Sequence, residues 1–147
     1  MEKPRVLFLC TGNSARSQMA EALLKKYAKD HFEIHSAGLE PKEINPFTLK
    51  VLNEVGINTE GQYAKPLSAF IGKMQFSYLI TVCSNAEDKC PMFPGMGLRM
   101  HWPFDDPASF KGNEKEKLEK FREIRDQIET RILTWLKELG IFHSVKS

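Results

Sequence analysis

The first 29 residues constrain the fold most strongly, because an apolar strand, a turn-forming loop and a helix follow one another without a break. Arg5 to Cys10 (RVLFLC) is a short and almost continuous apolar run, as expected for a strand buried on both faces. Thr11 to Ser17 (TGNSARS) consists mostly of small and turn-forming residues. From Gln18 to Lys29 the apolar residues recur with helical spacing. This order predicts the opening of an α/β fold.

The rest of the chain alternates in the same way between apolar and amphipathic segments. Strands are predicted at 32–36, 76–82 and 99–103, and helices at 46–55, 67–73 and 113–139. Residues 84–97 contain several prolines and glycines and are expected to form a loop with at most one or two turns of helix. The pattern predicts a single-domain three-layer α/β fold at residues 1–142, with a four-stranded parallel sheet between helices, and a tail at 143–147.

Charge and composition exclude several classes of protein. The net charge of +2 is too small to favour nucleic acid as a partner. A run of about 18 apolar residues and a signal-peptide pattern are both absent, so we expect a cytoplasmic protein that does not span a membrane. The chain has no CxxC pair and its histidines lack metal-ligand spacing, so neither a metal nor a cofactor is predicted. The sequence does not fix the oligomeric state, and a monomer is the working expectation.

The strongest functional signal is a cysteine that precedes an arginine by six residues at the junction of strand and helix. A loop of this length can turn its backbone N–H groups toward one centre, and the helix presents its positive end to the same point. The planar guanidinium of Arg16 suits a bidentate oxyanion contact, and a positive field favours the Cys10 thiolate. The Ser17 hydroxyl is placed to donate to that sulfur. The oxyanion-binding residues are therefore predicted to be Thr11, Gly12, Asn13, Ser14, Ala15 and Arg16.

A simpler interpretation is a strand end followed by a helix capped by Ser17. Against it stands the run from Phe8 to Glu21 (FLCTGNSARSQMAE), which closely resembles the low-molecular-weight tyrosine phosphatase superfamily. Within this run, Gln18 to Glu21 resembles the arsenate reductase branch of that superfamily. The resemblance covers essentially the whole chain, and it implies the low-molecular-weight phosphatase fold.

Two further cysteines bear on the choice between phosphatase and reductase. A phosphatase hydrolyses its cysteinyl intermediate with water, whereas a reductase must transfer two electrons and needs further thiols. The segment from Thr81 to Pro91 holds Cys83 and Cys90 and resembles the redox segment of thioredoxin-linked arsenate reductases. The resemblance implies that Cys83 attacks Cys10, that Cys90 then attacks Cys83, and that thioredoxin reduces the resulting disulfide. The sequence itself does not distinguish thioredoxin from a glutaredoxin-type reductant. Arsenate would be the substrate, phosphate and sulfate its analogues, and arsenic detoxification the role.

The spacing of these two cysteines adds a structural prediction. On one continuous helix, residues seven apart are separated by about 10 Å along the axis. A disulfide needs Cα atoms within about 7 Å of each other. Therefore residues 84–89 are either non-helical in the reduced protein or must unwind on oxidation, and we expect residues 84–97 to rearrange. The alternative is that Cys83 and Cys90 are buried structural thiols.

A carboxylate and several supporting residues complete the predicted site. The family's loop carries an Asp before Pro that faces the anion, which matches Asp106 here, with Asp105 as the fallback. Asp106 is expected to protonate a departing oxygen, although an Asp in a Pro-containing turn has a purely structural interpretation. The residues expected to support the loop are Asn13, Glu21, Ser36 and Lys65.

Two positions depart from the family pattern. Some relatives bind potassium with residues that match Asn13, Ser36 and an Asp at the position of Lys65, and here we expect the ammonium group to replace the ion. An exposed lysine without a role is the alternative. Ala15 stands where many relatives have a cysteine outside the relay. The functional alternatives to a reductase are a protein tyrosine phosphatase and a redox-sensing, oxyanion-binding regulator.

Overall fold

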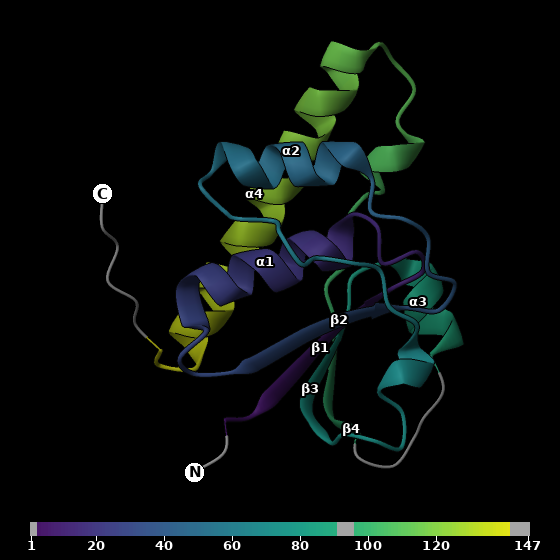
Figure 1. Ribbon diagram of the computed structural model, residues 1–147. Helices are drawn as coiled ribbons and strands as arrows, with labels where there is room; N and C mark the ends of the chain where they lie inside the picture. Colours follow the sequence, from purple (N-terminus) through teal and green to yellow (C-terminus); the bar gives the residue numbers. More distant parts are fainter. Residues whose placement is uncertain (1–2, 91–95, 142–147) are drawn as a thin grey trace.

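A computed structural model describes residues 3–90 and 96–141, which contain four strands in one parallel sheet (Figure 1). The strands are β1 (Arg5–Cys10), β2 (Glu33–Gly38), β3 (Phe76–Thr81) and β4 (Met96–His101), in the spatial order β2-β1-β3-β4. Leu9 of β1 lies opposite Thr81 of β3 in the register. The chain therefore leaves β1 and β3 side by side at the carboxyl edge of the sheet, where parallel α/β sheets bind ligands.

Helices and short turns cover both faces of this sheet. The helices are α1 (Arg16–Ala28), α2 (Pro46–Glu54), α3 (Ser84–Lys89) and α4 (Glu114–Glu138), with 3-10 turns η1 (Leu67–Ala69) and η2 (Pro107–Ser109). On one face α1 packs against β1, β2 and α4, and Tyr78 of β3 stacks edge-on against Trp135 of α4. On the other face Phe70, directly after η1, contacts His35 and Phe76. In Figure 1, α3 lies at the end of the sheet where β1 and β3 finish.

The core explains why β1 is the most apolar strand. Val6, Leu7, Phe8 and Leu9 are all fully buried, because β1 has a strand on each side and covered faces above and below. Burying an apolar side chain of this size contributes roughly 1.5–3 kcal/mol. Since β1 anchors the loop that follows Cys10, the best-packed strand holds the start of the predicted oxyanion site.

The predicted α/β fold with a four-stranded parallel sheet is confirmed, and most differences concern element ends. The first helix begins at Arg16 rather than Gln18, because the amide of Met19 already donates to the carbonyl of Ala15. Helix α2 ends at Glu54, η1 stops at Ala69 instead of Lys73, and β2 runs on to Gly38. The predicted tail at 143–147 lies outside the described residues.

The fourth strand shows the largest difference from prediction. It was expected at 99–103 but begins at Met96, within the segment predicted to be a loop. The reason is close packing: a Cβ on Gly97 would lie 2.5 Å from the carbonyl oxygen of Ser77. Glycine is thus required for the approach of β4 to β3, whereas in the sequence it indicated a turn. The predicted contribution of Pro91, Pro94 and Gly95 to the loop lies outside the described residues.

The ends of the long helix show how local sequence fixes its limits. The side chain of Asn113 accepts from the amide of Glu116, and the Glu116 carboxylate accepts from the amide of Asn113, which is a capping box. Gly140 takes a left-handed conformation with φ of 75° just past the other end. Among the described residues, no helix is both long and apolar enough to cross a membrane.

Candidate active site

The loop after β1 has its backbone carbonyl groups turned outward. The carbonyls of Cys10, Thr11, Gly12 and Ser14 accept hydrogen bonds from amides of the segment 39–45, at 2.8–3.1 Å, and the carbonyl of Asn13 accepts from Gln18 Nε2 at 3.1 Å. In a trans peptide the N–H points opposite to the C=O. The amides of residues 11–15 therefore point toward the inside of the loop, where they can surround an anion.

The start of α1 adds further donors to the same place. Its N-cap residue is Ala15, whose methyl side chain cannot satisfy the first helical amides. This arrangement excludes the interpretation of Ser17 as the cap, because Ser17 lies inside the first turn of α1. A 13-residue helix presents its positive end here, which favours a bound anion.

Asn13 holds the loop in shape through both ends of its side chain. Its φ of 49° is left-handed, a conformation that asparagine tolerates better than most residues. Asn13 Nδ2 donates to Ser17 Oγ at 2.8 Å and to Ser36 Oγ at 3.0 Å, and Asn13 Oδ1 accepts from the amide of Lys65 at 2.9 Å. The hydrogen bond described for Ser17 is thus to Asn13, whereas the sequence predicted one to Cys10. Gln18, which the sequence analysis did not assign, is fully buried and donates to Asn13 Oδ1 as well.

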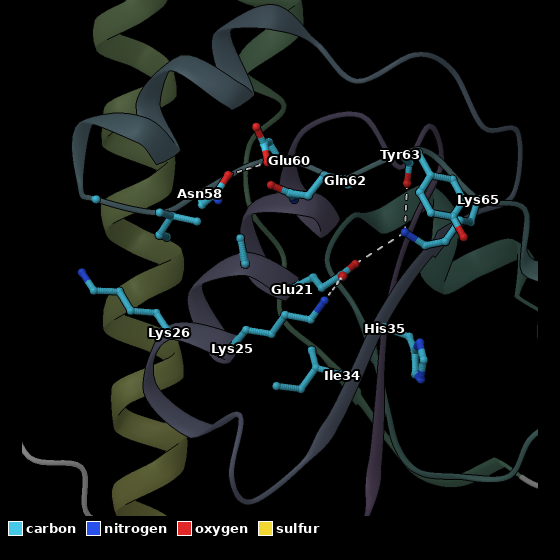
Figure 2. A pocket seen from close by; sticks show the side chains of 14 residues that line it. Glu21, Lys25, Lys26, Ile34, His35, Asn58, Glu60, Gln62, Tyr63 and Lys65 are labelled. Atoms are coloured by element: carbon cyan, nitrogen blue, oxygen red, sulfur yellow. Dashed lines mark hydrogen bonds and ion pairs between the residues drawn. The ribbon is translucent and has the colours of Figure 1, made fainter.

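Behind this network, Glu21 lines a cavity of about 520 Å³ together with Lys25 and Lys65 (Figure 2), and it also contacts Ser36. Ser36 Oγ donates to Glu21, Lys25 Nζ lies 2.6 Å from Glu21 Oε2, and Lys65 Nζ lies 3.5 Å from Glu21 Oε1. Lys65 Nζ also donates to the carbonyl of Tyr63 at 2.9 Å. Burial lowers the pKa of Lys65, and the Glu21 carboxylate partly offsets that effect. The ammonium group thus lies beside Glu21 of this network, and its replacement of a potassium ion stays a prediction.

Arg16 connects the loop to the segment after β4. Its Nη1 donates to the carbonyl of Phe104 at 3.0 Å, and its Nη2 lies 3.8 Å from Asp106 Oδ2. Asp106 Oδ1 accepts from the amide of Ala108, so this carboxylate caps η2 and faces Arg16 at once. The alternative carboxylate, Asp105, is 85% exposed and lies 4.0 Å from Lys120 instead. Of the two, Asp106 is the one that the fold brings to the loop.

The sulfurs of Cys10 and Cys83 meet at the carboxyl edge of the sheet. The two side chains are hydrogen-bonded, and the amide of Thr11 also donates to Cys10. The hydrogen bond from Cys10 lowers the pKa of Cys83 to about 5, with help from Thr11, the amide of Ala86 and Arg16. The same bond and burial raise the pKa of Cys10 above its ordinary value, and the positive charge of Arg16 offsets only part of the rise. The prediction that the positive field favours the Cys10 thiolate is therefore wrong for this structure, because Cys83 and burial outweigh Arg16. Of the two thiols, Cys83 is therefore the more acidic.

Cys83 is held in place by the first turn of α3. It is the N-cap residue of α3, and its sulfur accepts from the amide of Ala86 at 3.4 Å. Asn85 Nδ2 donates to Thr11 Oγ1 at 2.7 Å, and Thr11 Oγ1 is hydrogen-bonded to the Cys83 sulfur at 3.4 Å. Asn85 was missed by the sequence analysis. The one feature of the sequence that could have indicated a role for Asn85 is its position two residues after Cys83, which follows the end of a strand.

Cys90 lies at the opposite end of α3 and is 7% exposed. Burial raises the pKa of its thiol, and the positive charge of Arg99 partly offsets the rise. All three cysteines are reduced. Because six helical residues separate Cys83 from Cys90, the two cannot form a disulfide until α3 unwinds. Of the two cases that the sequence left open, the reduced chain adopts the helical one.

The described residues contain no group of three or more His, Cys, Asp or Glu that could hold a metal ion. What the site brings together is a cradle of amides and a guanidinium, with two sulfurs at its base and a carboxylate at its mouth. Such a site can bind a tetrahedral oxyanion, attack it with a thiolate and supply it with two electrons from paired thiols.

Comparison with known proteins agrees with this chemistry. Residues 5–141 match the family described as low molecular weight phosphotyrosine protein phosphatase. An arsenate reductase of Bacillus subtilis (strain 168) is 43% identical over 132 residues, which is 90% of this chain and 94% of that protein.

Two solved structures are similar to the whole fold. The structure of an arsenate reductase in the phosphate binding state superposes with a TM-score of 0.77 at 28% identity, covering 92% of this chain and 98% of that one. The thioredoxin-dependent arsenate reductase of Corynebacterium glutamicum gives a TM-score of 0.70 at 33% identity, covering 94% of this chain and 62% of that one. The chain belongs to the low molecular weight phosphotyrosine protein phosphatase family and, within it, groups with the arsenate reductases.

Proposed function

We propose that this protein reduces arsenate to arsenite by a relay of three cysteines, Cys10, Cys83 and Cys90, and that thioredoxin regenerates it. The observation that carries this proposal is that the fold brings Cys83 to the oxyanion loop that begins at Cys10: Leu9 lies opposite Thr81 in the sheet, and Thr11 Oγ1 lies 3.4 Å from Cys83 Sγ. A hydrolytic enzyme has no use for a second acidic thiol at that point. A reductase needs this second thiol, because it must attack the sulfur of the Cys10 adduct and form a disulfide with it.

The first step forms a bond between sulfur and arsenic. Arsenate binds to the inward amides of residues 11–16 and to the fork of Arg16. Transfer of the shared proton from Cys10 to Cys83, along their hydrogen bond, gives the Cys10 thiolate. The thiolate attacks arsenic, and one oxygen leaves as water after Asp106 supplies a proton. The 3.8 Å separation of Asp106 from Arg16 supports this role, since both side chains face the loop.

The second step is the reduction itself. Cys83 gives the proton that it took from Cys10 to an oxygen of the arsenic adduct and becomes a thiolate again. This thiolate attacks the Cys10 sulfur, the sulfur–arsenic bond breaks, and its electron pair stays on arsenic. Arsenic(V) becomes arsenic(III), arsenite leaves, and a Cys10–Cys83 disulfide remains, so two electrons have moved from two thiols to arsenic. Thr11, Asn85 and the amide of Ala86 keep the Cys83 sulfur aimed and ionised for this attack.

The third step moves the disulfide outward. The Cys90 thiolate attacks the Cys83 sulfur, a Cys83–Cys90 disulfide forms, and the Cys10 thiolate is released. Helix α3 must unwind for this exchange, which brings the disulfide toward a reductant such as the thioredoxin dithiol. We expect faster hydrogen exchange in residues 84–97 after oxidation. Equal exchange before and after oxidation would count against this rearrangement.

Substitution of the two resolving cysteines tests the proposal. We expect Cys83→Ser and Cys90→Ser to abolish multiple-turnover arsenate reduction, measured as NADPH oxidation with arsenate, thioredoxin and thioredoxin reductase. Hydrolysis of p-nitrophenyl phosphate should persist in both variants, because it needs only Cys10 and the loop. Retention of coupled arsenate reduction in either variant would refute the relay.

A second candidate function is hydrolysis of phosphate monoesters, which the loop, Arg16 and Asp106 favour because phosphate and arsenate are both tetrahedral. A phosphatase would turn over p-nitrophenyl phosphate but would not consume NADPH with arsenate. An oxyanion-binding redox regulator would instead form one equivalent of disulfide and stop. The same coupled assay, followed to many turnovers, separates the three.

A further inference from the structure

The redox helix α3 is fastened to β4 by one arginine. Arg99 Nε and Nη2 lie 2.9 and 2.8 Å from Glu87 Oε1, which makes a charge-assisted forked contact. The same guanidinium reaches the main chain of α3. Arg99 Nη2 donates to the carbonyl of Glu87 at 2.5 Å, and Arg99 Nη1 donates to the carbonyl of Cys90 at 3.3 Å.

These contacts fall where α3 would otherwise leave acceptors unsatisfied. The last carbonyls of a helix have no partner within it, and in a helix of six residues they are a large share of the whole. The internal bonds of α3 include those from the amide of Glu87 to Cys83 and from the amide of Cys90 to Ala86. A helix this short is marginal without external contacts. Arg99 supplies three of them from a neighbouring strand.

The Glu87 carboxylate has a second anchor in the sheet. Thr81 Oγ1, at the end of β3, donates to Glu87 Oε1 at 3.2 Å. The Arg99 and Glu87 side chains are only 23% and 32% exposed, so their contacts are partly shielded from water. The pair thus joins the first turn of α3 to strands β3 and β4 of the sheet.

We propose that Arg99 and Glu87 form a clasp that holds α3 helical, and so keeps Cys90 away from Cys83, until the Cys10–Cys83 disulfide has formed. The inference rests on the proposed function, since it concerns the last step of the relay. Both carbonyls that Arg99 binds belong to backbone that must rotate when α3 unwinds. Opening the clasp is therefore part of the exchange that breaks the Cys10–Cys83 bond and makes the Cys83–Cys90 bond. Arg99 and Glu87 are positioning residues and do not touch the substrate.

The clasp has an opposite effect on the two halves of the relay. It fixes the N-terminal turn of α3, which positions Cys83 for attack on Cys10. It also delays the approach of Cys90, which avoids a premature Cys83–Cys90 disulfide that would leave Cys10 without its resolving thiol. Loosening the clasp should accelerate the last exchange while the arsenate-dependent first disulfide still forms.

Glu87→Gln weakens the clasp and leaves the Arg99 charge beside Cys90, but it also removes a negative charge that raises the pKa of the Cys90 thiol. The decisive measurement on this variant is therefore hydrogen exchange in the reduced protein, which does not depend on the reactivity of Cys90. Reduced protein would be mixed with one equivalent of arsenate, acid-quenched and alkylated, and the two disulfides quantified by peptide mass spectrometry. We expect the Cys10–Cys83 disulfide to convert about three to ten times faster than in wild type. Hydrogen exchange of the 84–90 amides in the reduced protein should rise by a similar factor, while amides of β1 and β3 stay unchanged.

Two further variants sharpen the test. Arg99→Gln removes the main-chain contacts too and should raise exchange in 84–90 at least as much, and adding Glu87→Gln to it should change little. Glu54→Gln is the matched control, since Glu54 is 31% exposed, pairs with Arg122 and Arg125, and lies on α2 away from the cysteines. It should behave as wild type in both measurements.

The outcomes are separable. If arsenate produces no disulfide in wild type, the proposed function is wrong, and the exchange data on reduced protein still decide whether the clasp holds α3. If Glu87→Gln converts the first disulfide at the wild-type rate with unchanged exchange in 84–90, the clasp is refuted. If the Glu54→Gln control changes as much as Glu87→Gln, the effect is general destabilisation and the clasp is equally refuted.

Discussion

The oxyanion loop and helix α3 meet at the Cys10 and Cys83 sulfurs, but they are held in different ways. The loop is tied from behind by buried groups: Asn13, Ser17, Gln18 and Ser36 are fully buried, and the loop carbonyls from Cys10 to Ser14 accept hydrogen bonds. In α3 only Ala86 is buried, and the helix is held by contacts at its ends and by Arg99.

This difference matches what each region must do. An anion cradle works best when its donors are fixed before the anion arrives, because no reorganisation is then needed during reaction. A segment that has to carry a disulfide from the interior to a partner must open at low cost, and short exposed elements are the ones that open. A rigid loop and a releasable helix at one sheet edge are therefore complementary parts of one proposed relay.

The largest effect should come from the fixed region. Arg16→Lys keeps the positive charge and loses the planar fork, so arsenate-dependent formation of the first disulfide should slow about 10²–10³-fold. Rapid quench with arsenate measures this step alone. The α3 exchange rates should remain those of wild type, since the hydrogen bond and ion pair described for Arg16 go to Phe104 and Asp106. A slowing of less than tenfold would show that charge, and not geometry, carries the contribution of Arg16.

A smaller effect is expected from adding a methyl group at Gly38 of β2, which packs directly against the oxyanion loop. A Cβ on Gly38 would lie 2.7 Å from the carbonyl oxygen of Thr11 and 2.9 Å from the amide nitrogen of Asn13, both backbone atoms. Gly38→Ala should therefore lower the free energy of unfolding by about 1–3 kcal/mol and weaken phosphate binding, because the loop must shift. Urea unfolding and phosphate titration measure the two effects.

The matched control is Gly112→Ala, whose nearest neighbours are side chains of Phe110 and Glu116 that can move. Gly112→Ala should lower the free energy of unfolding by less than Gly38→Ala does, and it should leave phosphate binding unchanged. Equal losses in the two variants would mean that the oxyanion loop is as adaptable as a surface turn. The comparison between a rigid loop and a movable helix would then fail.

The same contrast explains what could be predicted from sequence. Strand β1 was predicted at its observed ends, because a strand buried on both faces has a continuous apolar pattern. The loop residues and Cys83 followed from a local motif and a strand end. Sequence reasoning failed at β4, where Gly97 is needed for close packing against Ser77 but indicates a turn by composition.

Side-chain contacts between residues far apart in the chain could not be predicted from the sequence either. The pairing of Arg99 with Glu87 joins residues 12 apart on different elements, and the contact of Asn85 with Thr11 joins residues 74 apart. Both depend on how the elements pack, which no local pattern encodes. Ser17 shows the same limit within the motif: its buried hydroxyl accepts from Asn13, because the network behind the loop includes Ser36 of β2.

The sulfur pair between the two regions gives a third prediction, on pH. Absorbance at 240 nm should show one thiolate half-formed near pH 5, because the pKa of Cys83 is lowered from 9.0 to about 5 by the hydrogen bond from Cys10 and by other donors. Since the folded pKa lies below the unfolded one, this ionisation stabilises the fold fully above about pH 9, and its contribution is lost as pH falls toward 5.

Cys10→Ala removes that hydrogen bond and should raise the pKa of Cys83 by about one unit or more, while Thr11 and Ala86 still hold it below the ordinary value. Cys90→Ala is the control and should leave the low transition in place. A thiolate that appears only above pH 8 in the wild-type protein would show that the pair does not share a proton.

The smallest effect should come from behind the loop. We expect potassium to change the rate of arsenate reduction less than twofold in wild type, because the Lys65 ammonium lies 3.5 Å from Glu21 and faces the network that includes Asn13 and Ser36. Lys65→Met removes this charge and leaves Glu21 ion-paired with Lys25 alone. The rate of arsenate reduction should therefore fall about two- to fivefold, and potassium should restore part of it.

Lys26→Met is the control for this variant. Lys26 lines the same cavity but lies near Val55 and Tyr27 instead of Glu21, so its loss should not change the rate or the effect of potassium. Strong potassium stimulation of the wild-type protein would mean that the ammonium does not replace an ion, and that the loop is completed by a cation from solution.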